Sequence, residues 1–557
     1  MPRLNRHGNA SGPLLVIFGL VCLGLLFYLS LNRNESAPQT SNSPQEISEV
    51  SETTSSHGDV PPSATSVMPD VANTPAASAK GPIWETWDKP VLALMLTGEQ
   101  HGYFEPCGCT SNQLGGMSRR ADLFQKLKDA GWAVRGLDAG GLARRSVRQS
   151  QIKFETTLTA LRDLNYAAIG LGPEELRLQP DFLLSQHLTT GESPLFFLSA
   201  NLTFFGTPEL GTPVPSAVFE EGGLKIGVTS VMSEEMQKEV LPHPDVNWKE
   251  PSSALEAVLA SFDEQNVDVR ILLCQGRVGE DFENETLQLA RQFPQFQIVL
   301  TANGIGDPDP NAAPRKVGDT LIIESGRKGK YVGVLGVYKS QNGEPSFRYK
   351  LVALERDDFN DTPSMVELMQ AYQTRLKDEQ IVLADAVSAP HPSGSTFVGA
   401  DKCGECHSKA FDVWKNSAHA HALESLDPSN QREGFERLNG VVREYDPECL
   451  ACHVNGWDPQ EYIRFRSGFL NEEFASTQTE KSLHTLMAGN QCENCHGPGS
   501  RHVELIEADN VEEARKLVRV TLEQARQGMC EKCHDSDNSP KFQFDEYWEL
   551  IKHPGLD

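Results

Sequence analysis

One five-residue pattern, Cys-x-x-Cys-His, occurs four times in the last third of this 557-residue chain and limits what that region can fold into. Two thiols one helical turn apart reach the two vinyl groups of a haem, while the adjacent imidazole binds the iron. A zinc site made from the same cysteines would leave the four histidines unexplained. The pattern therefore predicts four covalently attached haem c groups. The motif residues are Cys403, Cys406 and His407; Cys449, Cys452 and His453; Cys492, Cys495 and His496; and Cys530, Cys533 and His534.

The motifs begin 46, 43 and 38 residues apart, which is too close for four separate haem domains. We therefore expect one mainly helical domain at 395–557, with the motif histidines as proximal iron ligands. Distal ligands would come from other histidines of this segment, each of which has a surface position as its alternative. An iron without a distal ligand would instead bind small molecules. His419 and His421 are two residues apart and point to different sides of a helix. The five distal candidates are His419, His421, His484, His502 and His553.

The N-terminus carries an uncharged run of 19 residues, from Pro13 to Leu31, behind Arg3 and Arg6. At about 1.5 Å per residue a helix of this length just spans a bilayer core of roughly 30 Å. Basic residues ahead of the run place residues 1–12 in the cytoplasm. We expect a single-pass anchor in the inner (cytoplasmic) membrane, with most of the chain in the periplasm or outside the cell. The alternative is a cleaved signal peptide, which normally has a shorter apolar region. Residues 32–80 are rich in Ser, Thr, Pro and Ala and are expected to be a disordered linker.

The chain is acidic, since 50 Lys and Arg against 77 Asp and Glu give a net charge of −27. A nucleic-acid-binding protein needs a basic surface to neutralise phosphates, so the balance argues against a nucleic-acid partner. The propionates of four haems would add further negative charge. A redox protein partner of basic charge is therefore expected.

Residues 81–355 alternate short apolar runs with helical patterns, which predicts a layered α/β domain. Residues 362–389 have apolar positions at helical spacing and predict a connecting helix within a helical linker at 356–394. The predicted fold is thus multidomain: an α/β domain, then a mainly α haem domain, behind one transmembrane helix. The expected strands are 91–97, 133–137, 167–171, 195–198, 225–231, 269–274, 298–301 and 320–323.

The haem segment resembles the cytochrome c-554 and c-552 family of multihaem electron carriers. The resemblance lies in residues 397–407, in Phe411 and Trp414, in the Ser-Ala-His-Ala run 417–420, and in Cys-Glu-Asn-Cys-His-Gly-Pro-Gly-Ser-Arg-His at 492–502. It implies a helical tetrahaem domain with stacked haem pairs and electron transfer as the function. It also implies distal histidines from the 417–420 and 497–502 segments and, in some relatives, one five-coordinate haem.

The order of segments in the α/β region resembles the calcineurin-like metallophosphoesterases of the periplasmic 5′-nucleotidase type. The matching segments are 97–102, 137–141, 171–175, 274–276, 302–304 and 325–331. That family holds two metal ions with Asp, Asn and His ligands, and a two-metal hydrolase needs both ions about 4 Å apart. Here the corresponding positions are Gly141, Pro173 with Glu174, Gln275 and Asn303. We therefore expect an inactive phosphoesterase-like domain.

Glu99 and His101 are weak candidates for holding one non-haem metal ion, with plain polar surface as the alternative. In place of the expected metal residues stands Cys107-Gly-Cys109, followed by Arg119 and Arg120. Two thiols around one glycine form a reducible disulfide or bind a soft metal, and nearby arginines would lower a thiolate pKa. Cys107 and Cys109 are therefore redox candidates, with a structural disulfide as the alternative.

Electron transfer is the function that the sequence favours. Two other classes stay open. One is a multihaem reductase or oxidoreductase acting on a small nitrogen or sulfur compound. The other is a hydrolase of phosphoesters such as nucleotides.

Overall fold

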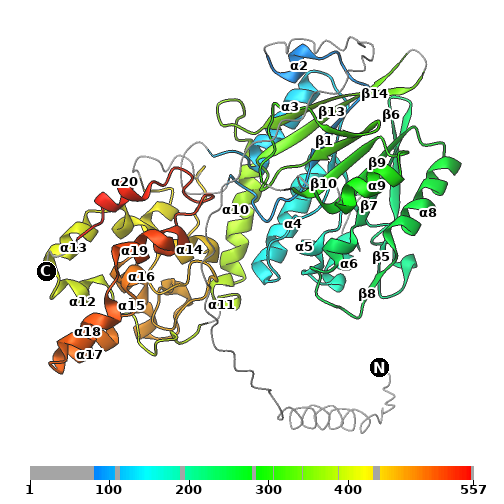
Figure 1. Cartoon of the computed structure of the whole chain (residues 1–557). Helices are drawn as coiled ribbons and strands as arrows, with labels where there is room; N and C mark the ends of the chain where they lie inside the picture. The colour runs from blue at the N-terminus through cyan, green and yellow to red at the C-terminus, as the bar shows by residue number, and fades with distance from the viewer. Residues whose placement is uncertain are drawn as a thin grey trace, which may run out of the picture. The chain divides into compact units, whose positions relative to one another are not determined.

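The computed structural model describes residues 81–106, 113–188, 195–278, 284–304, 306–340, 343–386, 388–430 and 439–553 (Figure 1). All of them belong to one compact unit. The predicted anchor, the predicted disordered linker and the pair Cys107 and Cys109 lie outside these ranges. Across the described ranges, no helix has the length and apolar character needed to cross a membrane.

Two six-stranded sheets form the centre of the α/β part. The first has the strand order β14-β13-β1-β2-β3-β4, in which β1, β2, β3 and β4 are parallel and β13 runs antiparallel to β1. Register is set by pairs such as Leu94 with Arg135 and Leu94 with Leu335. Its strands are β1 (Leu92–Thr97), β2 (Val134–Asp138), β3 (Tyr166–Gly170), β4 (Phe196–Leu198), β13 (Tyr331–Lys339) and β14 (Pro345–Ala353).

The second sheet has the order β11-β12-β10-β9-β7-β6, with β7, β9, β10 and β12 parallel. All eight strands expected from the sequence are present, and β9 continues four residues further than expected. The strands are β6 (Ser216–Glu221), β7 (Leu224–Met232), β9 (Val269–Val278), β10 (Ile298–Gly304), β11 (Arg315–Val317) and β12 (Thr320–Glu324), while β5 (Leu202–Phe204) and β8 (Val246–Trp248) form a separate pair.

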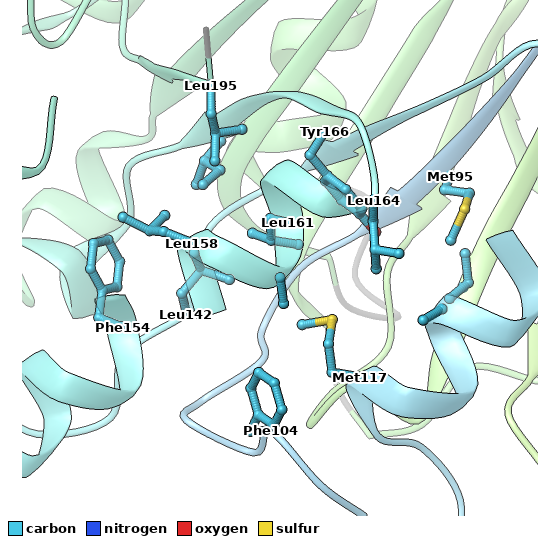
Figure 2. Close-up of a cluster of buried hydrophobic side chains, with 14 of the residues drawn as sticks. Met95, Phe104, Met117, Leu142, Phe154, Leu158, Leu161, Leu164, Tyr166 and Leu195 are labelled. Atoms are coloured by element: carbon cyan, nitrogen blue, oxygen red, sulfur yellow. The ribbon is translucent and has the colours of Figure 1, made fainter. Parts of the chain in front are cut away.

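The side chains of β1 point alternately to the two faces of the sheet, which shows how the layers pack. Leu92, Leu94 and Leu96 enter a buried cluster shared with β7, β9, β10 and β13, so the two sheets pack face to face. Ala93 and Met95 point the other way, into a cluster with the helices, because successive strand residues face opposite sides. Figure 2 shows part of that second cluster around Met95. The result is a four-layer α/β/β/α arrangement, as predicted for a layered α/β domain.

Helices cover both outer faces. α3 (Met117–Asp129), α4 (Arg148–Asp163) and α10 (Pro363–Asp378) contribute to the cluster on the first sheet, and α8 (Pro251–Glu264) and α9 (Glu285–Gln292) to the cluster on the second. Shorter helices precede β1 or lie between the strands. These are α2 (Ile83–Thr86), α5 (Pro173–Leu176), α6 (Pro180–Leu188), α7 (Glu234–Gln237) and η1 (Pro208–Leu210).

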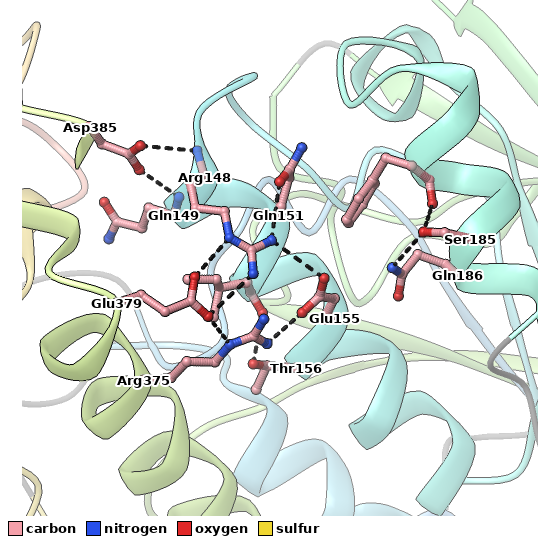
Figure 3. A network of polar contacts seen from close by, with 12 residues as sticks. Arg148, Gln149, Gln151, Glu155, Thr156, Ser185, Gln186, Arg375, Glu379 and Asp385 are labelled. Atoms are coloured by element: carbon pink, nitrogen blue, oxygen red, sulfur yellow. Dashed lines mark hydrogen bonds and ion pairs between the residues drawn. The ribbon is translucent and has the colours of Figure 1, made fainter. Parts of the chain in front are cut away.

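The helix α10 is part of this layer, although the sequence suggested only a connection. Its apolar face, which includes Met365 and Leu376, is buried in the cluster with α4. Polar contacts add to this packing (Figure 3). Arg148 donates from Nε to Glu379 at 2.8 Å, and Arg375 donates to the same carboxylate at 2.6 Å. Asp385, just after α11 (Ile381–Ala384), accepts the first backbone N–H groups of α4 and so caps that helix.

The haem-motif segment is built from short helices around a small apolar cluster that includes Leu450, Trp457 and Phe469. The helical character matches the prediction for this region. Its elements are α12 (Ala400–Gly404), α13 (Ser408–Lys415), η2 (Ala418–His421), η3 (Leu423–Leu426), α14 (Pro447–His453), η5 (Glu472–Phe474), α15 (Gln478–Leu486), α16 (Cys492–His496), α17 (Ser500–Glu507), α18 (Val511–Val518), α19 (Leu522–Gln524), η6 (Ala525–Met529), η7 (Cys530–Lys532) and α20 (Phe544–Glu549).

Candidate haem-binding site

Each Cys-x-x-Cys-His motif forms one helical turn. The second and third lie on α14 and α16, and the first and fourth begin on α12 and η7. In the first motif the N–H of His407 donates to the carbonyl of Cys403 at 2.9 Å, and His534 donates to Cys530 in the same way. The turn therefore holds both thiols and the imidazole of a motif within reach of one flat group, as covalent haem attachment requires.

The motif thiols are available for such attachment. Each of the eight motif cysteines is exposed or only partly buried. Cys274 is the contrast, since it is fully buried and its pKa is raised to about 12, first by burial. The accessible cysteines among the described residues thus lie in the motifs, and Cys274 is a core residue.

Three of the four motif histidines face a second histidine across a similar gap. The ring centroids are 6.3 Å apart for His407 and His502, 6.0 Å for His534 and His419, and 5.9 Å for His496 and His553. An imidazole nitrogen binds a transition metal at about 2 Å, so two rings on opposite sides of one ion have centroids about 6 Å apart. The residues present therefore fit a haem iron between each pair.

Hydrogen bonds fix the tautomer of several of these rings. Nδ1 of His496 lies 2.7 Å from the carbonyl of Val518, and Nδ1 of His502 lies 2.9 Å from that of Ala514. A carbonyl oxygen only accepts, so Nδ1 carries the proton and Nε2 keeps its lone pair for a metal. His453 and His553 make the same kind of bond, to the carbonyls of Ala422 and Ile551.

The protonation of the paired rings also suits metal binding. Burial, followed by the nearby His534 and His453 rings, lowers the pKa of His419 to about 4. Burial likewise lowers the pKa values of His496 and His534. A ligand imidazole must be neutral at the coordinating nitrogen, and these rings are neutral at physiological pH.

The two remaining distal candidates face other groups. His421 is 37% exposed, and its Nδ1 lies 3.1 Å from Glu424 Oε1. The ring of His484 packs on Phe469 with centroids 5.2 Å apart. His419 and His421 thus point in different directions, as their two-residue spacing predicts.

Glu493, inside the third motif, is a residue whose role the sequence did not reveal. Its carboxylate is 3% exposed and accepts hydrogen bonds from the backbone N–H groups of Val398, Gly399 and Gly499 at 2.7 to 2.9 Å. It also accepts from Asn455 Nδ2 at 2.8 Å. The side chain therefore joins the segments that carry the first, second and third motifs. The pattern Cys-x-x-Cys-His treats this position as variable, which hides its structural role.

The residues expected at the phosphoesterase-like site gather at the carboxyl ends of the parallel strands. Glu99 and His101 follow β1, with Glu99 Oε1 3.7 Å from His101 Nε2. The same oxygen lies 3.5 Å from Arg327 Nε, so a guanidinium faces the carboxylate. Among the described residues, no three or more His, Cys, Asp or Glu side chains cluster as a metal site requires.

Two of the altered positions at this edge, Gly141 and Gln275, make internal contacts. The buried carboxylate of Glu175 accepts from the backbone N–H groups of Gly141, Leu142 and Gly172 at 2.6 to 3.1 Å. Gln275 donates to the carbonyl of Ala139. These residues hold the loops of the edge together by hydrogen bonds.

A buried charge network lies beneath the same edge. Arg120 is fully buried and donates to Gln100 Oε1 at 2.5 Å. Asp138 accepts from Thr97 Oγ1 at 2.6 Å; burial raises its pKa, opposed by Thr97 and by the charge of Arg120. Arg119 donates to the carbonyl of Leu354 at 3.2 Å. Both arginines that the sequence placed near the Cys107 and Cys109 pair thus have internal acceptors.

Comparison with known proteins supports the resemblance of the haem segment. Residues 402–497 match the family model of cytochrome c554 and c-prime. Cytochrome c-554 of Nitrosomonas europaea is 33% identical over 106 residues, which cover 18% of this chain and 39% of that protein. The chain thus spans about two fifths of the curated relative it matches. The match implies covalently bound haem c in this segment.

Solved structures similar to this chain include the 5′-nucleotidase precursor of Thermus thermophilus, at 21% identity and a TM-score of 0.45. That alignment covers 54% of this chain and 61% of the other. The calcineurin-like phosphoesterase YfkN of Bacillus subtilis aligns at 14% identity and a TM-score of 0.42, over 51% of this chain and 97% of the other. The similarity is remote, so the chemistry of the α/β part rests on its own residues.

Proposed function

We propose that this chain is a membrane-anchored tetrahaem c-type cytochrome that transfers electrons on the periplasmic side of the cytoplasmic membrane. The observation that carries the proposal is the set of three facing histidine pairs, His407 with His502, His534 with His419, and His496 with His553. Each pair joins a motif histidine to a histidine outside any motif. The bound haems would supply reversible one-electron chemistry at potentials set by their axial ligands and surroundings.

The chain's own residues have three roles in this proposal. The eight motif cysteines anchor the four groups through thioether bonds. The three histidine pairs would hold three of the irons. The acceptors at Nδ1, such as the carbonyls of Val518 and Ala514, hold the rings in the binding tautomer and so tune the sites.

The number of haems tests the proposal directly. Protein matured in a host that attaches haem c should carry four haems per chain, measured from the pyridine haemochrome absorbance and the intact mass. Serine in place of Cys449 and Cys452 should remove one haem and leave three. Fewer than four haems in the unaltered protein would contradict the tetrahaem function.

We propose that the α/β domain has no phosphoesterase activity. Gly141 and Gln275 stand where the resembling family has metal ligands, and Arg327 rather than a further ligand faces Glu99. Metal analysis together with turnover of a generic phosphoester and of AMP tests this. A metal-dependent turnover lost on Glu99→Gln would establish a hydrolase instead.

A spectral titration separates electron transfer from the reductase alternative. Carbon monoxide binds only a ferrous haem with an open or weakly held distal position. The three irons held between the facing histidine pairs should show no change. A haem that binds carbon monoxide in the unaltered protein would favour a reductase of a small nitrogen or sulfur compound.

The proposed partner is a basic redox protein, because the chain has a net charge of −27. Electrostatic steering raises association rates at low ionic strength and fades as salt screens the charges. Electron exchange with a basic cytochrome should therefore slow as salt rises. Exchange that is faster with an acidic partner would contradict this part of the proposal.

A further inference from the structure

A pocket of about 410 Å³ opens at the carboxyl edge of the strands. This volume is in the range of roughly 300 to 1,000 Å³ that is typical of small-molecule sites. Besides Tyr103 and Gly306, its lining residues are His101, Arg144, Asp307, Arg327, Lys328 and Lys330. Four cations and one carboxylate therefore line the pocket, in a chain whose net charge is −27. The carboxylate, Asp307, accepts from Lys330 Nζ at 2.9 Å, so the remaining three cations give the lining a net positive charge.

The cations are held in place by the fold. Arg327, Lys328 and Lys330 all come from the loop between β12 and β13, and the backbone N–H of Lys328 donates to the carbonyl of Glu99 at 2.7 Å. Lys328, Glu99 and His101 have φ values of 57°, 49° and 48°, in the left-handed region. For residues other than glycine this conformation costs about 1 kcal/mol or more and is concentrated at functional sites.

One of the cations has an unused donor. Arg327 Nε is buried and makes no hydrogen bond within the described structure. The nearest carboxylate oxygen, Glu99 Oε1, lies 3.5 Å away and is itself buried without a hydrogen-bond partner. The Glu99 carboxylate offsets part of the charge of Arg327 but makes no hydrogen bond to Nε, so a ligand acceptor at hydrogen-bond distance would be favourable here.

Lys328 also contacts the segment of the fourth haem motif. Its ammonium pairs with Asp537, and the backbone carbonyl of Asp537 accepts from Gln113 Nε2 at 2.8 Å. Asp537 and Ser539 donate through their backbone N–H groups to Asp535, and Ser539 Oγ lies 2.9 Å from His534 Nδ1. A continuous set of contacts therefore runs from the pocket to the fourth motif histidine.

We propose that this pocket binds a small, multiply charged oxyanion and that its occupancy is linked to the redox state at His534. An anion beside Lys328 competes with Asp537 for the Lys328 ammonium. Loss of the ion pair with Asp537 changes the loop that carries Asp537 and Ser539, and Ser539 contacts the His534 ring. Because linkage is reciprocal, reduction of the haem iron that His534 would hold would also change the affinity for the anion. The anion is either inorganic or the phosphate group of an organic ester. The proposed anion site depends only on the pocket residues, whereas the redox link rests on the proposed cytochrome function.

Isothermal titration of the full, haem-loaded chain with inorganic phosphate, sulfate and AMP, at constant ionic strength, tests the binding site. We expect saturable binding that weakens at least roughly tenfold in Arg327→Gln and in Lys330→Gln, each of which loses one cation of the pocket. Lys316→Gln on the exposed strand β11 is the matched control and should bind as the unaltered chain does. Tighter binding of AMP than of phosphate assigns an organic ester, and the reverse order assigns an inorganic anion.

The proposal is overturned if none of the three probes binds, or if both pocket variants bind as tightly as Lys316→Gln does. Haem content and circular dichroism of each variant check that it is folded. Arg144→Gln provides an independent pocket variant from another loop.

A redox titration with and without the tightest-binding probe tests the link. We expect the midpoint of one haem to shift in the unaltered chain and to stay constant in Asp537→Asn. Anion binding that shifts no haem midpoint potential would refute the redox link but not the anion site. A chain with four haems that binds no anion would refute the pocket and leave the cytochrome proposal intact.

Discussion

Lys153 on α4 donates to Glu448 on α14 at 2.5 Å, one residue before Cys449 of the second haem motif. Burial alone would lower the pKa of Lys153, but the carboxylates of Glu448 and Asp446 outweigh burial and raise it. Asp446 accepts in addition from Gln149 Nε2 and Gln373 Nε2, at 2.7 and 2.9 Å. The α/β domain and the haem-motif segment therefore share a buried polar contact.

We expect Lys153→Met to destabilise the chain. The substitution removes the cation that balances Glu448 and Asp446, and an uncompensated buried charge costs several kcal/mol. The two side chains are 15% and 26% exposed, so solvent screening reduces the effect to about 2 kcal/mol. Denaturant unfolding followed by circular dichroism measures it.

A double-mutant cycle with Glu448→Gln separates the pair from general damage to the interface. If the two side chains stabilise each other, the double variant should lose less folding stability than the two single variants lose together. The difference should be about 1 kcal/mol or more. Strictly additive losses would show that the pair contributes no mutual stabilisation. Lys316→Met on the exposed strand β11 is the surface control.

The strands were predictable because their apolar runs are short, separated by helical patterns and rich in branched residues, as in Ile298, Val299 and Leu300. The packing of α10 was harder to predict. Its apolar positions predict a helix, but only the buried contact of Leu376 with the α4 cluster shows that this helix belongs to the α/β layer. Periodicity indicates which face is buried and says nothing about the partner.

The motif histidines were predictable because attachment chemistry places them directly after the second cysteine. Three of the distal candidates do face a motif histidine, but the sequence did not show which candidate faces which motif histidine. His407 and His502 are 95 residues apart in the chain, and His419 and His534 are 115 apart. Such pairs depend on how distant helices pack, which no local pattern records. The cations of the pocket were hidden for a similar reason, since Arg144 and Arg327 come from loops of different strands.

Glu493→Gln should destabilise the haem-motif segment by about 2 kcal/mol, because hydrogen bonds to a charged acceptor contribute more than neutral ones. The amide group would also turn its N–H groups toward the backbone donors of Val398 and Gly499. Glu531 has the same position in the fourth motif and is exposed, so Glu531→Gln is the matched control. Equal unfolding midpoints for the two variants would refute the structural role of Glu493.

The stability of the α/β part should depend on pH through Glu175. Burial, with the nearby Glu174, raises the pKa of Glu175 from 4.5 to about 7. The folded state then binds the proton more tightly than the unfolded state. The contribution of Glu175 to stability is therefore fully present below about pH 4.5. It is lost as pH rises to about 7, by up to roughly 3 kcal/mol.

Glu175→Gln should flatten this part of the pH profile, since the amide does not titrate. Glu174→Gln should make the profile less steep, because it removes one cause of the raised pKa. Thermal unfolding at a series of pH values measures both effects. A profile unchanged in Glu175→Gln would show that this carboxyl does not govern the dependence.

Replacement of a distal histidine should open one iron and leave the number of haems unchanged. His502 faces His407, so His502→Ala should convert one haem per chain from low spin to high spin and let it bind carbon monoxide. His419→Ala and His553→Ala should each do the same for the haems held by His534 and His496.

His421→Ala is the matched control, because His421 contacts Glu424 and lies two residues from His419. Electron paramagnetic resonance of the oxidised proteins distinguishes the spin states. A high-spin haem in His421→Ala, or its absence in His502→Ala, would show that the histidines are paired differently.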